Sequence, residues 1–252
     1  MKVGIAYPAF KECFEDLLET EITDISFYSE PLDDTEMLKI LFELDLVIFS
    51  GGEDISPGVY GQENTHSSGI NIKRDQIEIK ILELSRKIDA KILGVCRGHQ
   101  IINAFFGGNL CQDIFLSGKK YHESIHNLDW KYFGYMSKNF KTVNSLHHQG
   151  VISPGYGFSP VAYKDEIIEA TIYKNKIFSV QWHPEFMTEK FKEFKNLINS
   201  WVEEKNTIFD FVSSSKINIE EKEKQELINE LMSELQTDFV GVETVSTDHD
   251  EL

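Results

Sequence analysis

Apolar and polar residues follow two different periods along the first half of the chain. Short apolar runs of the kind found in buried strands cover residues 2–6, 22–28, 45–50 and 91–95. Apolar side chains three and four positions apart, the spacing of a helix face, cover residues 10–18, 35–42 and 75–88. Strands that alternate with helices in this way predict a parallel α/β sheet with right-handed connections.

The pattern changes between about residue 121 and residue 182. Shorter alternating segments, separated by turn residues, lie at residues 141–146, 167–173 and 176–182. They predict added strands that are at least partly antiparallel. Residues 187–201 return to helical spacing, with one apolar stripe formed by Phe191, Phe194, Leu197, Ile198 and Trp201. We therefore expect one α/β domain over residues 1–202, with an open, mostly parallel sheet flanked by helices.

The last fifth of the chain differs in charge. Residues 203–252 carry 14 Asp or Glu against 4 Lys, a net charge of 4 − 14 = −10. Asn218 and Glu221 have the spacing of a helix cap, and apolar residues from Leu227 to Leu235 follow at helical spacing, which predicts one amphipathic helix. Residues 241–252 are acidic and poor in large apolar groups, so we expect them to be disordered. Residues 203–252 are thus predicted to be an acidic appendage, and truncation after about residue 205 should leave the domain folded.

Charge and cysteine content limit the partners and the compartment. The formal net charge of −17, with no local basic patch, repels nucleic acid and anionic membranes. No run approaches the ~20 apolar residues of a membrane span, and the first eight residues resemble a strand more than a signal peptide. The three cysteines, Cys13, Cys96 and Cys111, are odd in number, widely spaced and without a metal-binding partner, which fits a reducing compartment. We expect a cytoplasmic protein without metal or cofactor.

A cysteine lies where a predicted strand turns into a predicted helix. The segment Gly94-Val95-Cys96-Arg97-Gly98 has the G-x-C-x-G pattern of a nucleophile elbow. In such a turn the flanking glycines let strand and helix approach closely, and the thiol lies at a helix N-terminus, which favours the thiolate. From these residues alone, a buried structural cysteine is the competing interpretation. The elbow makes Cys96 the candidate nucleophile.

Two further segments favour the catalytic interpretation. His183 and Glu185 follow an apolar strand two residues apart, a spacing that points both side chains to one face of an extended chain, so Glu185 can orient the imidazole that activates Cys96. Gly51 and Gly52 follow the strand at residues 45–50, where they can simply make a turn. They also leave the Gly52 N–H free to face a developing oxyanion beside the N–H of Arg97.

These pieces, in this order, resemble the class I glutamine amidotransferases, whose order is oxyanion glycine, cysteine elbow and His-x-Glu. The segments at residues 51–61, 74–75, 107–114 and 143–150 are more narrowly similar to the γ-glutamyl-γ-aminobutyrate hydrolase group. The resemblance covers about residues 2–202. It departs at Asp165-Glu166, where the group usually has Asp-Gly, and residues 121–134 and the acidic tail do not follow the group's pattern.

The resemblance implies an acyl transfer in which Cys96 attacks a γ-glutamyl amide, an amine or ammonia leaves, and water resolves the glutamyl thioester. His183 would act as base and then as acid. By position, Gln100, His147 and His148 would contact the glutamyl part of the substrate, although two polar strand residues are the competing interpretation of the histidines.

Three functions stay open at this point. The first is a free-standing hydrolase that releases glutamate from a small γ-glutamylated metabolite. The second is a glutaminase that supplies ammonia to a partner synthase, for which the predicted helix from Leu227 to Leu235 offers a docking element, although that helix can equally pack on its own domain. The third is a noncatalytic scaffold, which the joint presence of Cys96, His183 and Glu185 disfavours.

Overall fold

The computed structural model describes residues 1–26, 34–88, 90–116 and 124–213. The amphipathic helix expected after Asn218 and the disordered end expected at residues 241–252 lie outside this part of the chain. One compact unit spans Met1–Ser214. It includes α7 (Ile208–Ser213), whose Ile208 and Val212 are fully buried in the core. The unit therefore extends past residue 202, where the sequence places its boundary, and a truncation after residue 205 would remove part of the core.

The main sheet begins with parallel strands. From one edge, the order of its strands is β2 (Ile22–Asp24), β1 (Val3–Ile5), β3 (Leu46–Phe49), β4 (Lys91–Val95) and β12 (Ile177–Val180). Every adjacent pair among these strands is parallel. This order confirms the predicted α/β class. Within residues 176–182, predicted as one of the added strands, Ile177–Val180 form β12, which pairs in parallel with β4.

Antiparallel strands extend the sheet beyond β12. They are β11 (Ile167–Tyr173), β10 (Ser159–Lys164) and β7 (Asp129–Trp130), while β5 (Asn109–Cys111) pairs with β9 (Gly150–Ser153), which joins β11. The predicted strand at residues 141–146 forms β8 (Thr142–Asn144), which pairs with β6 (Ile125–Asn127) in a separate two-stranded sheet. The prediction of added, partly antiparallel strands is confirmed.

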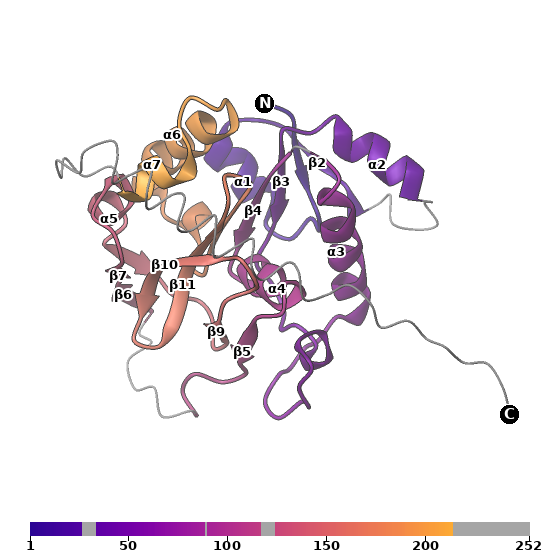
Figure 1. Ribbon diagram of the computed structural model, residues 1–252, viewed down its shortest axis with the longest axis vertical. Coiled ribbons are helices and arrows are strands. Elements are labelled where there is room, and N and C mark those ends of the chain that lie inside the picture. Colours follow the sequence, from indigo (N-terminus) through magenta and orange to yellow (C-terminus); the bar gives the residue numbers. More distant parts are fainter. Residues whose placement is uncertain (27–33, 89, 117–123, 214–252) are drawn as a thin grey trace, which may run out of the picture. The chain divides into compact units, whose positions relative to one another are not determined.

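Helices cover both faces of the sheet (Figure 1). The helices α1 (Lys11–Leu18), α5 (Tyr135–Asn139), α6 (Phe191–Val202) and α7 share one apolar core, and α2 (Asp34–Phe42), α3 (Ile72–Ser85) and α4 (Arg97–Phe105) share the other. Strand β3 serves both, because Leu46 and Ile48 point to the first core and Val47 and Phe49 to the second. The fold thus has three layers, with the sheet in the middle and one group of helices on each of its faces.

Two helices begin away from their predicted starts. Helix α3 starts at Ile72 and not at residue 75, because the Asn71 side chain accepts a hydrogen bond from the Arg74 N–H and caps the helix. Helix α6 starts at Phe191 and not at residue 187, because the 3-10 turn η4 (Thr188–Lys190) precedes it. Another 3-10 turn, η2, covers Pro57–Tyr60. Among the described residues, no helix has both the length and the apolar character to span a membrane. The expected cytoplasmic location stays a prediction.

The parallel order determines which loops meet. Strands β3, β4 and β12 are neighbours and run in the same direction, so their carboxyl ends lie at one edge of the sheet. The residues that follow them are Ser50, Cys96 and Gln181, respectively. Loops at this edge of a parallel sheet commonly form the active site.

Candidate active site

Cys96 occupies a strained turn between β4 and α4. Its backbone has φ 51° and ψ −105°, a region that L-residues rarely adopt, and its side chain is 5% exposed. Its N–H donates to the Val180 carbonyl of β12 at 2.8 Å. A side chain at Gly98 would meet the Phe49 carbonyl oxygen at 1.9 Å, and one at Gly94 would meet the Gly98 backbone at 2.9 Å. The two glycines therefore allow the close approach of strand and helix that the elbow requires.

His183 follows β12 and is held on several sides. Its Nδ1 lies 2.7 Å from Glu185 Oε1, so Nε2 is the ring nitrogen left for Cys96. The ring stacks on Phe186 with centroids 5.1 Å apart, and Phe10 meets the ring edge-on at 6.1 Å. A side chain at Gly51 would meet His183 Cε1 at 2.6 Å. The imidazole is therefore confined between aromatic rings, a carboxylate and the Gly51 backbone.

The protonation of His183 reflects its neighbours. Burial lowers the pKa of this histidine, but the charge of Cys96, a hydrogen bond with Cys96 and the contact with Glu185 raise it from the ordinary 6.5 to about 10. An imidazole with this pKa stays protonated at neutral pH and can stabilise a thiolate beside it. The arrangement places a protonated imidazole, oriented by a carboxylate, next to the Cys96 side chain.

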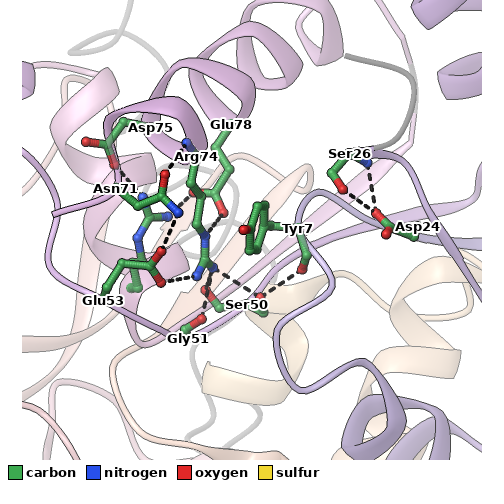
Figure 2. A network of polar contacts seen from close by, with 11 residues as sticks. Tyr7, Asp24, Ser26, Ser50, Gly51, Glu53, Asn71, Arg74, Asp75 and Glu78 are labelled. Atoms are coloured by element: carbon green, nitrogen blue, oxygen red, sulfur yellow. Dashed lines mark hydrogen bonds and ion pairs between the residues drawn. The ribbon is translucent and has the colours of Figure 1, made fainter. Parts of the chain in front are cut away.

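The loop after β3 brings Gly52 to the same edge. Gly52 has φ 150°, and a side chain there would meet Arg74 Nη1 at 2.1 Å. Arg74 is fully buried and donates from Nη2 to the carbonyl oxygens of Ser50 and Gly51, at 3.1 and 2.9 Å. Figure 2 shows the Arg74 guanidinium directed at this loop. The loop is therefore fixed through the carbonyl oxygens of Ser50 and Gly51.

The three residues expected to contact substrate lie in different surroundings. The Gln100 side-chain amide donates to the Gln149 carbonyl at 3.1 Å and to Gln181 Oε1 at 3.2 Å. His147 is buried, with Nδ1 2.8 Å from the Gln149 carbonyl oxygen. His148, by contrast, has a side chain 37% exposed and places Nε2 3.0 Å from the Asp54 carboxylate. Of the three, only His148 is accessible.

Two residues near the site were not picked out from the sequence. Gln181 Nε2 donates to Cys96 Sγ at 3.6 Å and so contacts the candidate nucleophile directly. The Asn144 side chain accepts from the His183 N–H and donates to the His183 carbonyl, both at 2.8 Å. Gln181 comes directly after β12, so its place at the carboxyl end of a strand could have indicated it. Nothing in the sequence indicated that Asn144 contacts His183, beyond its place in the segment at residues 143–150 that resembles the family.

Potential metal ligands do not gather in the part of the chain that the structure describes. Within the described ranges, no three His, Cys, Asp or Glu side chains lie close enough together to hold a metal ion. The three cysteines are free thiols.

Comparison with known proteins agrees with this geometry. The family model described as Peptidase C26 matches residues 25–185. The chain belongs to the Peptidase C26 family. This class I glutamine amidotransferase-like family includes γ-glutamyl-γ-aminobutyrate hydrolase, so the family recognised from the motifs is confirmed. The protein is accordingly a class I glutamine amidotransferase-like hydrolase.

Individual relatives of this Peptidase C26 member support the assignment. The glutamine amidotransferase-like protein YvdE of Lactococcus lactis subsp. lactis (strain IL1403) is 34% identical over 202 residues, which cover 73% of this chain and 82% of YvdE. GMP synthase [glutamine-hydrolyzing] of Ehrlichia ruminantium (strain Gardel) is 24% identical over 72% of this chain and 33% of its own. A Thermoplasma acidophilum structure, provisionally described as part of a GMP synthase, has a TM-score of 0.57 at 18% identity, covering 81% of this chain and 96% of that one. That structure confirms the fold.

Proposed function

We propose that this protein hydrolyses a γ-glutamyl amide through a glutamyl thioester on Cys96. The observation that carries the proposal is geometric: β4 and β12 are parallel neighbours, Cys96 follows the first, and His183, with its Nδ1 2.7 Å from Glu185 Oε1, follows the second. The raised pKa of His183, which comes from its contacts with Cys96 and Glu185, agrees with this arrangement. The geometry therefore supports chemistry that needs a thiolate and a nearby proton donor.

The proposed reaction has two halves. The Cys96 thiolate attacks the amide carbonyl carbon, a C–S bond forms, and the carbonyl electrons move to the oxygen. The N–H groups of Gly52 and Arg97 face that oxyanion. The electrons return, the C–N bond breaks, and the imidazolium of His183 gives its proton to the departing amine. Water, deprotonated by His183, then attacks the thioester, the C–S bond breaks, and glutamate leaves.

Contacts with the glutamyl part are proposed from the family resemblance and from exposure. His148 is the accessible member of the three candidates, and its contact with Asp54 fixes the ring beside the oxyanion loop. Gln100 and His147 stay predictions as substrate contacts, because the structure gives both of them internal partners. Gln100 does reach the nucleophile indirectly, through Gln181.

A second candidate function is a glutaminase that passes ammonia to a partner synthase. The similarity to GMP synthase of Ehrlichia ruminantium, in which this chain matches only 33% of the length, favours it, because that protein is named as glutamine-hydrolysing. The expected docking helix after Asn218 lies outside the described residues. The free hydrolase is our first choice, because 82% of YvdE is matched by this chain alone.

The test is glutamate release from glutamine and a panel of γ-glutamyl amines, with and without cell extract. The free hydrolase predicts turnover of at least one γ-glutamyl amine by purified protein, whereas turnover of glutamine only with extract favours the partner-dependent glutaminase. Cys96→Ala should abolish release, and Cys111→Ala, a half-buried cysteine in β5, should retain it. Release that survives Cys96→Ala would contradict the proposal, and so would the absence of release from every substrate under both conditions.

A further inference from the structure

The first turn of α3 places a buried arginine against the oxyanion loop. Besides its two bonds to the carbonyl oxygens of Ser50 and Gly51, Arg74 donates from Nη1 to Glu53 Oε2 at 2.7 Å and from Nε to Glu78 Oε1 at 2.9 Å. Its guanidinium also lies 4.6 Å from the centroid of the Tyr7 ring (Figure 2). Each of the three guanidinium nitrogens therefore donates at least one hydrogen bond, and those from Nη1 and Nη2 hold the loop at residues 50–53.

One of these carboxylates, Glu78, also binds Arg97, the residue that follows the candidate nucleophile. Glu78 accepts from Arg74 through Oε1 and from Arg97 Nη1 through Oε2. Asp75 accepts from Arg97 Nη2 through Oδ1 and from the Ser56 N–H through Oδ2. Glu78 thus bridges two arginines, one bound to the loop after β3 and the other part of the elbow after β4.

Such a network is costly as a source of stability. The side chains of Arg74, Glu78, Arg97 and Asp75 are at most 3% exposed, and removing charges from water offsets much of their attraction. What the network provides instead is fixed geometry, because forked guanidinium contacts admit little variation in the placement of their partners.

We propose that Arg74 is a positioning residue that sets the spacing between the two oxyanion donors, the N–H groups of Gly52 and Arg97. This inference rests on the proposed function. Arg74 acts from the loop side, and Glu78 transmits its position to Arg97 on the elbow side. Gly52 is required at its position because its lack of a side chain admits Arg74 Nη1 behind the loop.

The consequence concerns one chemical step. Donors that are already in place stabilise an oxyanion without a cost of reorganisation, and a displacement of about 1 Å at such a site can reduce the rate by about 10²-fold. Arg74 should therefore affect reactions that develop an oxyanion and leave unaffected reactions that only use the Cys96 thiolate. Alkylation by iodoacetamide is of the second kind, because the sulfur displaces iodide at a saturated carbon.

The experiment compares Arg74→Lys with Lys80→Gln, in the full chain and on whichever substrate the wild type hydrolyses. Lysine keeps the positive charge but cannot reproduce the fork, whereas Lys80 lies on the same helix in an exposed pair with Asp34. For Arg74→Lys we expect kcat to fall by about 10- to 100-fold. KM and the rate of Cys96 alkylation should stay within about threefold of wild type, since neither depends on an oxyanion. Lys80→Gln should match the wild type in all three measurements.

Two results would overturn the inference: unchanged kcat in Arg74→Lys, or alkylation that slows in parallel with kcat, which would indicate general damage. If Arg74→Lys does not fold, Glu53→Gln decides, because Glu53 is part-exposed and receives bonds from Arg74 and Asn71. Its kcat should fall about 3- to 10-fold at constant alkylation rate, and an unchanged kcat rejects the proposal. Failure of the proposed function itself is distinguishable, because the wild type would then release no glutamate.

Discussion

The two sides of Cys96 are built from different chemistry. On the oxyanion side, Arg74 and Arg97 are fixed by the buried carboxylates of Asp75 and Glu78 and by the part-exposed carboxylate of Glu53, through ion pairs to the guanidinium groups. On the imidazole side, His183 is confined by the aromatic rings of Phe10 and Phe186 and by a single carboxylate, Glu185. One side is held by charge and the other mainly by packing.

The difference corresponds to what each side has to do. Backbone N–H donors never change protonation, so their side of the site gains from rigidity alone. The imidazole must bind and release a proton, and a ring among several buried charges would have its pKa fixed by all of them. Aromatic neighbours confine the ring and leave Cys96 and Glu185 as the charges that raise its pKa. Substitutions on each side test this division, from the largest expected effect to the smallest.

Replacing His183 by Asn should have the largest effect. The variant loses both the partner of the thiolate and the proton donor for the leaving amine, so kcat should fall by about 10⁴-fold or more. Steady-state assays of glutamate release measure this loss. Iodoacetamide alkylation at neutral pH should also slow, in contrast with Arg74→Lys. A His183→Asn variant with more than a tenth of wild-type activity would remove His183 from the mechanism.

Replacing Glu185 by Gln should have the next largest effect. The amide keeps the size of the carboxylate but removes the charge that orients and helps to protonate the imidazole, so kcat should fall by about 10²- to 10⁴-fold. The fold should be retained, as circular dichroism can verify. Should the variant keep wild-type kcat, Glu185 is only a structural partner of His183.

Matched alanine substitutions at Gly52 and Gly51 separate the two sides. In Gly52→Ala the new methyl group meets Arg74, and in Gly51→Ala it meets the His183 ring. Gly52→Ala should reduce kcat by about 10²-fold at an unchanged alkylation rate, since it displaces an oxyanion donor. Gly51→Ala should slow alkylation as well, because it displaces the imidazole. The division between the sides fails if the two variants behave alike in both assays.

The smallest effect is a shift in titration. The pKa of His183 is raised from 6.5 to about 10, partly by the charge of Cys96, so Cys96→Ala should lower this pKa. A raised folded-state pKa stabilises the folded chain fully below pH 6.5, and this contribution is lost as pH rises through about 10. In Cys96→Ala, where the pKa of His183 is lower, this contribution to folding stability should be lost at a lower pH. NMR titration of the His183 ring measures the shift. An unchanged pKa would show that the charge of Cys96 does not raise the pKa of this imidazole.

The parts of the site that could be predicted are those encoded by local patterns. The elbow around Cys96 is a short segment whose spacing alone implies a turn. The turn at Gly51 and Gly52 after β3 was predictable in the same way, because two glycines directly after a strand indicate a turn. The contact between His183 and Glu185 was predicted from an extended chain, but Glu185 lies in the 3-10 turn η3 (Pro184–Phe186), so the contact is present and the expected strand face is not. The α/β class was also predictable, because the alternation of periods along the first half of the chain depends only on neighbouring residues.

The remaining features depend on pairings between distant segments. Strand β12 was predicted as an added strand, but its parallel register with β4 is what places His183 beside Cys96, and no local pattern encodes that register. Arg74 illustrates the same limit, because its position at the start of a helix says nothing about a loop more than twenty residues earlier. The part played by α7 in the core was missed because Ile208 and Val212 are too few residues for a helix period to stand out.

Covalent labelling tests the central claim most directly. The protein is treated with a diazoketone analogue of glutamine, with and without excess γ-glutamyl substrate, and the modified peptide is identified by mass spectrometry while residual glutamate release is followed in parallel. The account predicts one modification per chain, on Cys96, in proportion to the loss of activity and suppressed by substrate. Loss of activity with Cys96 unmodified, or full activity with Cys96 modified, would contradict it.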